Sequence, residues 1–476
     1  MKHLNFKKLI CSILAFALAF TLASCTQEKP PEETSTASVT HFIVNLDNNI
    51  SVLVDANGNE IMRSEYMNSP NGYYSNSAEV PFVVVWNSDV VTDENGRETE
   101  ISLSALYSID GTLLQDFQEC SYTAAFGDFI IRTNYYMADS VEQEELFSDL
   151  INAYTGEVLY HNIDQVSVQE ENFIVLYNTE MKIAAIVDSS GAAIDGLSLA
   201  SSYYSIDKYG DYFLGYTSRV DNETGYPIYE IFILNEQLEP ISSAYYSIIS
   251  CAPYFLAERD DNMVDVIDPA TGKVIFQEQF LLYYGDDYYI YRVYLENYES
   301  LFVLHNSNGT RLTSSTSYFA ALPAEEDKPL RFYFVSSNNA DVICIDKNGE
   351  VLAQQHFSND TYYVEVCGNL LSVSVLPENE YVQQTCFLVD ADLNVIDLDG
   401  RVYTSIYALS HNDNRFHAYY TTEQGFSAYD ILDANGNVLL EISDIQYSVE
   451  GYLVVTQGAY AGVVDVDGNW LFRTEY

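Results

Sequence analysis

The feature that most constrains the fold of this 476-residue chain is a short hairpin pattern that recurs along it. Each copy has an apolar run, an Asp or Asn, two or three further residues, a Gly and a second apolar run. An Asp at the first turn position accepts a backbone N–H, and the Gly supplies the left-handed conformation that closes the hairpin. The flanking Val, Ile and Leu residues are strand formers. Each copy therefore predicts a tight two-stranded hairpin.

About eleven copies follow one another, and between them lie Tyr-containing strands that each lead into a strongly apolar strand. The strong copies are residues 51–62, 183–194, 264–275, 341–352, 429–440 and 463–472, and the weaker ones 105–114, 149–159, 232–241, 301–312 and 387–396. The repeating unit is thus four short strands. The sequence predicts an all-β fold over residues 41–476, a β-propeller-like array of about ten or eleven four-stranded meanders. Because single propellers usually close with four to eight blades, one large ring, two tandem rings and an open array remain alternatives.

The last copy, GAYAGVVDVDGNW at residues 458–470, resembles the WG-type repeats of bacterial proteins. The other copies keep the Asp-turn-Gly hairpin without the Gly-aromatic-Gly part. The resemblance implies β-repeats in a surface or secreted protein, and it implies no particular activity.

The N-terminus resembles that of a bacterial lipoprotein. A Lys-containing start is followed by an apolar run of secretory length at residues 9–21, and Leu22-Ala23-Ser24-Cys25 is similar to a lipobox. The resemblance implies that residues 1–24 are a signal peptide and that Cys25 carries the lipid. Residues 25–40, rich in Pro, Ser, Thr and acids, predict a disordered tether. We therefore expect an extracytoplasmic protein, lipid-anchored to the cell membrane; an ordinary secretory signal is the alternative.

Acidic residues dominate the charge of the chain. The sequence has 70 Asp and Glu against 20 Lys and Arg, a formal charge of -50, and residues 1–24 hold three lysines and no acid, which leaves -53 afterwards. Such a field repels phosphate backbones and argues against a nucleic-acid partner. Membrane contact is expected through the lipid anchor alone.

The cysteines after Cys25 do not form a disulfide framework. They are five, an odd number, and widely scattered: Cys120, Cys251, Cys344, Cys367 and Cys386. We expect buried free thiols, with one bridge among the last three as the alternative.

No nucleophile elbow, P-loop or dinucleotide fingerprint occurs, and His411 and His417 lack a metal-ligand spacing and are expected in a surface loop. No cofactor is expected, with Ca²⁺ as the one candidate ion. Its candidate ligands are Asp390, Asp392 and Asn394, which alternate as in a calcium loop, although Val395 stands where such a loop needs Gly. The three residues are interpreted first as an ordinary hairpin turn, and the calcium site is the alternative.

The 41 tyrosines include several doublets. Because strand side chains alternate between faces, one ring of a doublet packs inside and the other faces solvent or a ligand. The candidate ligand-binding tyrosines are Tyr203, Tyr245, Tyr283 and Tyr362.

These patterns predict a non-catalytic lipoprotein whose propeller binds an extracellular protein, peptide or glycan. The alternative is a carbohydrate-active or other hydrolytic propeller enzyme, which would need a pair of placed carboxylates.

Overall fold

The structure is a computed structural model that describes residues 41–46, 49–70, 81–92, 98–136, 145–163, 165–169, 173–177, 183–188, 203–209, 212–220, 225–235, 238–251, 253–259, 261–295, 300–323, 329–336, 341–357, 361–376, 384–409, 414–422, 424–449 and 451–475. The predicted signal peptide, the predicted tether and Cys25 lie outside these residues.

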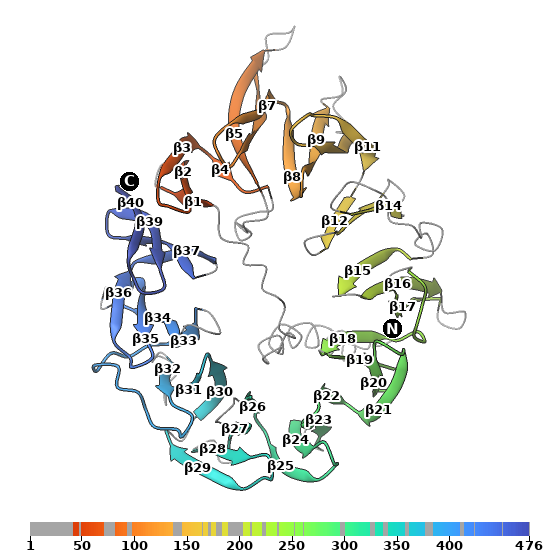
Figure 1. Ribbon diagram of the computed structural model, residues 1–476, viewed down its shortest axis with the longest axis vertical. Helices are drawn as coiled ribbons and strands as arrows, with labels where there is room; N and C mark the ends of the chain where they lie inside the picture. Colours follow the sequence, from red (N-terminus) through yellow and green to blue (C-terminus); the bar gives the residue numbers. More distant parts are fainter. Residues whose placement is uncertain are drawn as a thin grey trace, which may run out of the picture. The chain divides into compact units, whose positions relative to one another are not determined.

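Within these ranges the chain forms strands and no α-helix. The strands make eleven antiparallel sheets, seven of four strands and four of three, and every sheet is built from consecutive strands (Figure 1). This confirms the predicted fold class, an all-β propeller-like array of meander repeats. In two of the three-stranded sheets an isolated bridge stands where a fourth strand would lie, at Leu234–Pro240 and at Val389–Val395.

The described residues fall into two compact units. The terminal unit joins residues 41–244 to residues 442–475, and the central unit is Tyr245–Glu441. Whether the repeats close as one ring or as two tandem rings stays a prediction.

The terminal unit holds six of the sheets. Their strands are β1 (His41–Asn45), β2 (Ile50–Asp55) and β3 (Glu60–Glu65); β4 (Met67–Asn68), β5 (Phe82–Thr92), β6 (Glu98–Ser108) and β7 (Leu113–Gln118); β8 (Cys120–Phe126), β9 (Phe129–Tyr136), β10 (Glu145–Asn152) and β11 (Val158–Ile163); β12 (Gln165–Gln169), β13 (Phe173–Tyr177) and β14 (Ile183–Asp188); β15 (Ser205–Tyr209), β16 (Tyr212–Val220) and β17 (Pro227–Leu234); and β37 (Asp444–Val449), β38 (Tyr452–Gln457), β39 (Tyr460–Asp465) and β40 (Trp470–Glu475).

The central unit holds the other five sheets. Their strands are β18 (Ser247–Cys251), β19 (Tyr254–Glu258), β20 (Met263–Asp268) and β21 (Lys273–Gln279); β22 (Leu281–Tyr284), β23 (Tyr288–Tyr294), β24 (Ser300–Asn306) and β25 (Arg311–Ser315); β26 (Ala320–Leu322), β27 (Arg331–Val335), β28 (Asp341–Asp346) and β29 (Val351–His356); β30 (Thr361–Cys367), β31 (Leu370–Val375) and β32 (Thr385–Val389); and β33 (Ser405–Ala408), β34 (Arg415–Thr421), β35 (Ser427–Asp433) and β36 (Val438–Ile442).

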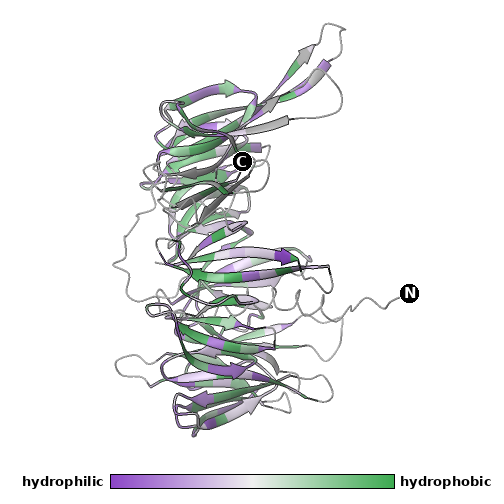
Figure 2. Ribbon diagram, turned by 90° about the vertical axis from the view of Figure 1, so that its right-hand side faces the viewer, coloured by the Kyte–Doolittle hydropathy of each residue, from purple (hydrophilic) through white to green (hydrophobic). Residues whose placement is uncertain are grey.

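The core lies between neighbouring sheets and is supplied by their middle strands. In the first sheet of the central unit, β19 and β20 are mostly buried, whereas the last strand, β21, is mostly exposed. In the sheet β30–β32, the middle strand β31 is likewise buried, with five buried residues in succession. Figure 2 shows green, hydrophobic segments within the strands. The first apolar run of a hairpin, as in β20, is therefore a strand buried on both faces, whereas the second run, as in β21, is mostly exposed.

Candidate functional site

The repeated hairpin turns share one geometry. At Asp55, one carboxylate oxygen accepts the backbone N–H groups of Asn57 and Asn59, at 2.9 and 2.8 Å, and the other accepts the Asn59 side chain at 2.9 Å. Gly58 sits at φ 82° and donates its N–H to the Asp55 carbonyl. The turns that begin at Asp346, Asp390, Asp433 and Asp465 repeat the two carboxylate–backbone bonds and a carboxylate–Asn bond.

The calcium candidates lie in one of these turns. Asp390 accepts the N–H groups of Asp392 and Asn394 at 2.9 and 2.8 Å and the Asn394 amide at 2.8 Å. The carboxylate of Asp392 pairs with Arg331 at 2.7 Å. Leu393 occupies the left-handed position, at φ 65°, that Gly takes in the other copies. The three residues thus make the same turn hydrogen bonds as the equivalent residues of the other turns. No group of His, Cys, Asp and Glu side chains that could hold a metal ion occurs in the described part of the chain.

A second repeated feature, which the sequence patterns above did not predict, is a buried acid three residues before the turn residue. Asp149, Asp265 and Asp430 occupy this position on β10, β20 and β35, and they are 7%, 4% and 0% exposed. The signal is visible in the sequence as an acid inside an otherwise apolar strand, three residues ahead of Asn152, Asp268 or Asp433.

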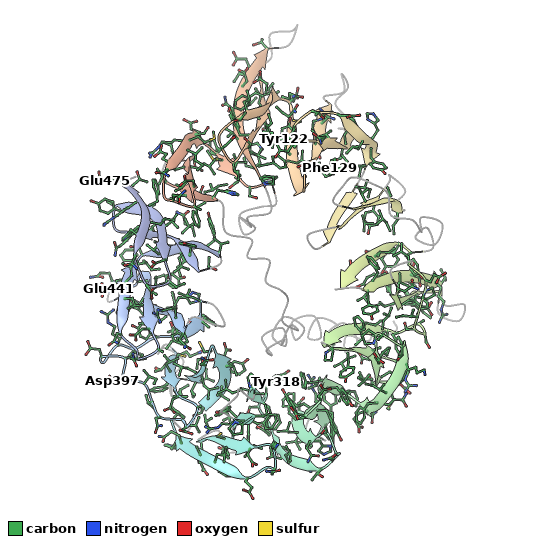
Figure 3. The ribbon with its side chains drawn as sticks, in the orientation of Figure 1. Tyr122, Phe129, Tyr318, Asp397, Glu441 and Glu475 are labelled. Carbon is green, nitrogen blue, oxygen red and sulfur yellow. The ribbon has the colours of Figure 1, made fainter. Side chains whose placement is uncertain are left out.

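Each buried acid is paired. Asp430 accepts hydrogen bonds from Tyr403 at 2.7 Å and from Arg401 at 2.6 Å, and Arg401 also pairs with Glu441, a β36 residue that Figure 3 labels, at 2.6 Å. Burial raises the pKa of Asp430, although Tyr403 and Arg401 oppose that rise. Asp265 likewise binds Tyr245 at 3.0 Å and Arg259 at 3.2 Å.

The candidate tyrosines differ in burial and in their contacts. Tyr203 and Tyr245 are buried, at 8% and 5% exposure, whereas the second members of their doublets, Tyr204 and Tyr246, are 42% and 55% exposed. The predicted division is therefore present in these two doublets, and in both the ring that reaches solvent is the second one. The Tyr283 ring stacks on Tyr288 with centroids 4.7 Å apart. The side chain of Tyr362 lies outside the described residues.

Tyrosines gather on one face of the β15–β17 sheet, the Tyr204 face, formed by the exposed Tyr204 and Tyr229 and the half-buried Tyr216. The Tyr204 ring lies 6.3 Å from that of Tyr216 and 6.2 Å, edge to face, from that of Tyr229. Tyr229 is 54% exposed. Burial raises the pKa of Tyr204, and the charges of Tyr229 and Asp207 add to that rise. A carboxylate is thus within electrostatic reach of rings whose faces attract cations and stack on apolar surfaces.

The central unit has its own aromatic face, the Tyr407 face, on β33–β35. Tyr407 stands opposite His417 and Tyr419 opposite Tyr429, with ring centroids 5.5 and 5.3 Å apart. Burial lowers the pKa of His417, which is therefore uncharged at neutral pH. The prediction of a surface loop is wrong for His417, because its side chain packs between rings on a strand. His411 lies outside the described residues.

The thiols of Cys120, Cys344, Cys367 and Cys386 are free and buried, as expected. The side chain of Cys251 lies outside the described residues. In the portion of the chain that the structure covers, no helix has the length and hydropathy to span a membrane.

No protein-family model and no curated protein matches the chain. Among solved structures, a eukaryotic initiation factor matches with a TM-score of 0.40 and 11% identity over 75% of this chain and 96% of that chain. BamB from Moraxella catarrhalis matches with a TM-score of 0.28 and 13% identity over 72% of this chain and 96% of that chain. The computationally designed Ika8 protein matches with a TM-score of 0.27 and 10% identity over 74% of this chain and 96% of that chain.

Proposed function

We propose that this chain is an extracytoplasmic lipoprotein, anchored through Cys25, whose propeller-like part binds a cationic or neutral partner without turning over a substrate. The partner is an extracellular protein, peptide or glycan. The observation that carries the proposal is the Tyr204 face, where the exposed rings of Tyr204 and Tyr229 lie edge to face and the charge of Asp207 acts on Tyr204.

The chemistry of that face favours a positively charged partner. Tyr rings attract ammonium and guanidinium groups through their faces, and an adjacent carboxylate strengthens the attraction. The chain already uses this interaction internally, because the guanidinium of Arg473 lies 3.8 Å from the ring centroid of Tyr460 and 5.0 Å from that of Trp470. The formal charge of the chain, -50, also favours a positively charged partner.

The predicted anchor and tether suit capture at a surface. A lipid at Cys25 and a flexible segment over residues 26–40 would hold the sheets near the membrane, where tethering raises the effective concentration of a partner. Cys25→Ser is expected to release the protein from the membrane fraction or to block its maturation. Recovery of membrane-bound protein that still carries residues 1–24 would contradict the anchor.

The binding surface can be tested with an array of Lys- and Arg-containing peptides and neutral oligosaccharides. Tyr229→Ser is expected to weaken binding of the selected ligand about tenfold, through loss of ring contacts. Tyr246→Ser is the matched control, because Tyr246 is equally exposed, at 55% against 54%, and lies in the other unit. Added salt is expected to weaken binding of a cationic ligand. Hydrolysis of a glycan or peptide that a single Asp or Glu substitution abolishes would instead support the hydrolase alternative.

A further inference from the structure

One hairpin of the terminal unit is longer than the sheet to which it belongs. β5 and β6 pair along eleven residues each, from Phe82–Ser108 to Thr92–Glu98. Their neighbours are short: β4 pairs only with Val84 and Val85, and β7 pairs with no residue of β6 before Ser104. Figure 1 shows β5 running out past β4 and β7. Within the described residues, the outer part of this hairpin, the β5–β6 ribbon, therefore has no third strand beside it.

The edge of the ribbon on the β5 side is closed by side chains. Trp86 donates its N–H to Tyr66, so the even-numbered residues of β5 turn their backbone groups toward the β4 side. Beyond the end of β4 the next two such N–H groups, of Ser88 and Val90, donate to the side chains of Asn87 and Asp89, both at 2.8 Å. These bonds occupy donors that another strand would need.

The edge on the β6 side is open. Ser108 donates its N–H to Thr112, so the even-numbered residues of β6 turn their backbone groups toward the β7 side. Past Ser104 these residues are Ser102, Glu100 and Glu98, and all three are exposed. No hydrogen bond occupies their outward N–H groups in the described part of the chain. The ribbon thus has one blocked edge and one free edge.

We infer that the free edge of β6, from Glu98 to Ser102, binds an extended segment of a basic partner, which adds a strand beside β6. An added strand gains main-chain hydrogen bonds, and its side chains are selected by those of the edge. Here Glu98 and Glu100 lie on one face of the ribbon and the half-buried Ile101 lies on the other, which favours Lys or Arg alternating with apolar residues in the added strand.

Charge excludes a second copy of this chain as the occupant. Pairing two β6 edges would set Glu98 and Glu100 of one copy beside those of the other, between molecules that each carry a formal charge of -50. This binding site rests on the proposed function only for the positive charge of the partner. The residues of the β6 edge are not those of the Tyr204 face.

The experiment exploits two serines that face each other across the ribbon, Ser88 and Ser102. Both direct their N–H outward, but on opposite edges, and Pro at such a position removes the donor without removing a bond between β5 and β6. The probe is a fluorescent peptide of alternating Lys and Val, and its binding to the full-length protein is followed by anisotropy. A Glu–Val peptide is the charge control, and circular dichroism verifies that both variants fold.

The wild type is expected to bind the Lys–Val peptide and not the Glu–Val peptide. Ser102→Pro should weaken that binding at least about tenfold, whereas Ser88→Pro should leave it nearly unchanged. Absence of binding by the wild type, or equal binding by wild type and Ser102→Pro, would overturn the inference. A loss in Ser88→Pro alone would move the site to the other edge and overturn it too. A loss in Tyr229→Ser alone would assign the peptide to the Tyr204 face instead, which separates failure of this inference from failure of the proposed function.

Discussion

At the residue scale, the hairpin turns depend on one carboxylate and one left-handed residue each. The left-handed position tolerates a side chain only when space is available, and the glycines of the central unit differ in this respect. A Cβ on Gly436 would clash with the carbonyl oxygen of Asp397, whereas a Cβ on Gly400 would meet nothing within 4 Å. Both glycines have positive φ, 82° and 73°.

Gly436→Ala is therefore expected to destabilise the protein more than Gly400→Ala. Gly400→Ala pays only the cost of a left-handed Ala, about 1 kcal/mol, while Gly436→Ala adds a clash with backbone and should cost about 3 kcal/mol or more. Denaturant midpoints of the two variants measure the difference. Equal losses would show that the contact with Asp397 does not constrain the turn.

The turn carboxylates also make stability depend on pH. Hydrogen bonds from the side chain and then the backbone of Asn59 hold the pKa of Asp55 below its ordinary value. The stabilisation from Asp55 is thus complete above the unfolded-state pKa, about 4, and is lost as the pH falls through the lower folded-state pKa. Asp55→Asn should lose stability relative to the wild type at pH 6, and the gap should narrow below about pH 4.

A group with the opposite shift provides the control. Burial raises the pKa of Glu258, so its contribution to stability falls as the pH rises from about 4 through the folded-state pKa. Glu258→Gln should therefore gain stability relative to the wild type at neutral pH and lose that advantage in acid. Urea denaturation at several pH values measures both trends, and parallel curves for the two variants would contradict the assignment.

At the scale of the strand and sheet, the buried acids Asp265 and Asp430 each bind a tyrosine that precedes the first strand of their sheet. Tyr403 precedes β33 and Asp430 lies on β35, so their hydrogen bond spans the width of two strands. The second oxygen of Asp430 is buried without a hydrogen-bond partner in the described residues. The Tyr403 and Arg401 bonds therefore carry the whole compensation for burying this carboxylate.

Tyr403→Phe is expected to cost about 1–3 kcal/mol, because it removes one of the two groups that satisfy a fully buried carboxylate. Tyr419→Phe, which removes an exposed bond to Ser427 on the same sheet, should change stability by less than about 0.5 kcal/mol. Chemical denaturation compares the two. A cost for Tyr419→Phe as large as that for Tyr403→Phe would indicate that the buried acid is not the reason.

The same sheets show what the sequence could predict. Hairpins were predictable because an Asp and a Gly at fixed spacing act locally, as at Asp55 and Gly58. The burial of Tyr203 rather than Tyr204 was not, because either ring of a doublet satisfies strand alternation and the neighbouring sheet decides which one packs. The pairing of Asp430 was not predictable for a related reason. Its partners Arg401 and Tyr403 lie almost thirty residues away in the sequence, and only packing brings them together.

At the scale of the whole molecule, the first sheet of the chain packs against the last. Phe42 and Val44 of β1 pack with Val454 and Val463 of the final sheet in one core. Backbone groups on the edge of β1 are satisfied by side chains there. The Tyr447 hydroxyl accepts the Ile43 N–H and donates to the Ile43 carbonyl, both at 2.9 Å, and the Gln446 amide does the same for Asn45 at 3.0 and 2.7 Å.

Because the proposed anchor at Cys25 precedes β1, a pull on the tether would reach this contact first. Tyr447→Phe removes two buried hydrogen bonds and leaves the N–H and carbonyl of Ile43 without partners, so it should cost about 1–3 kcal/mol. Amide exchange at Ile43 should speed up, while exchange at Tyr333 in the central unit should not change. Retained protection at Ile43 would mean that the apolar core around Phe42 holds the chain ends together without these bonds, and the N-terminal sheet would then stay docked by packing alone.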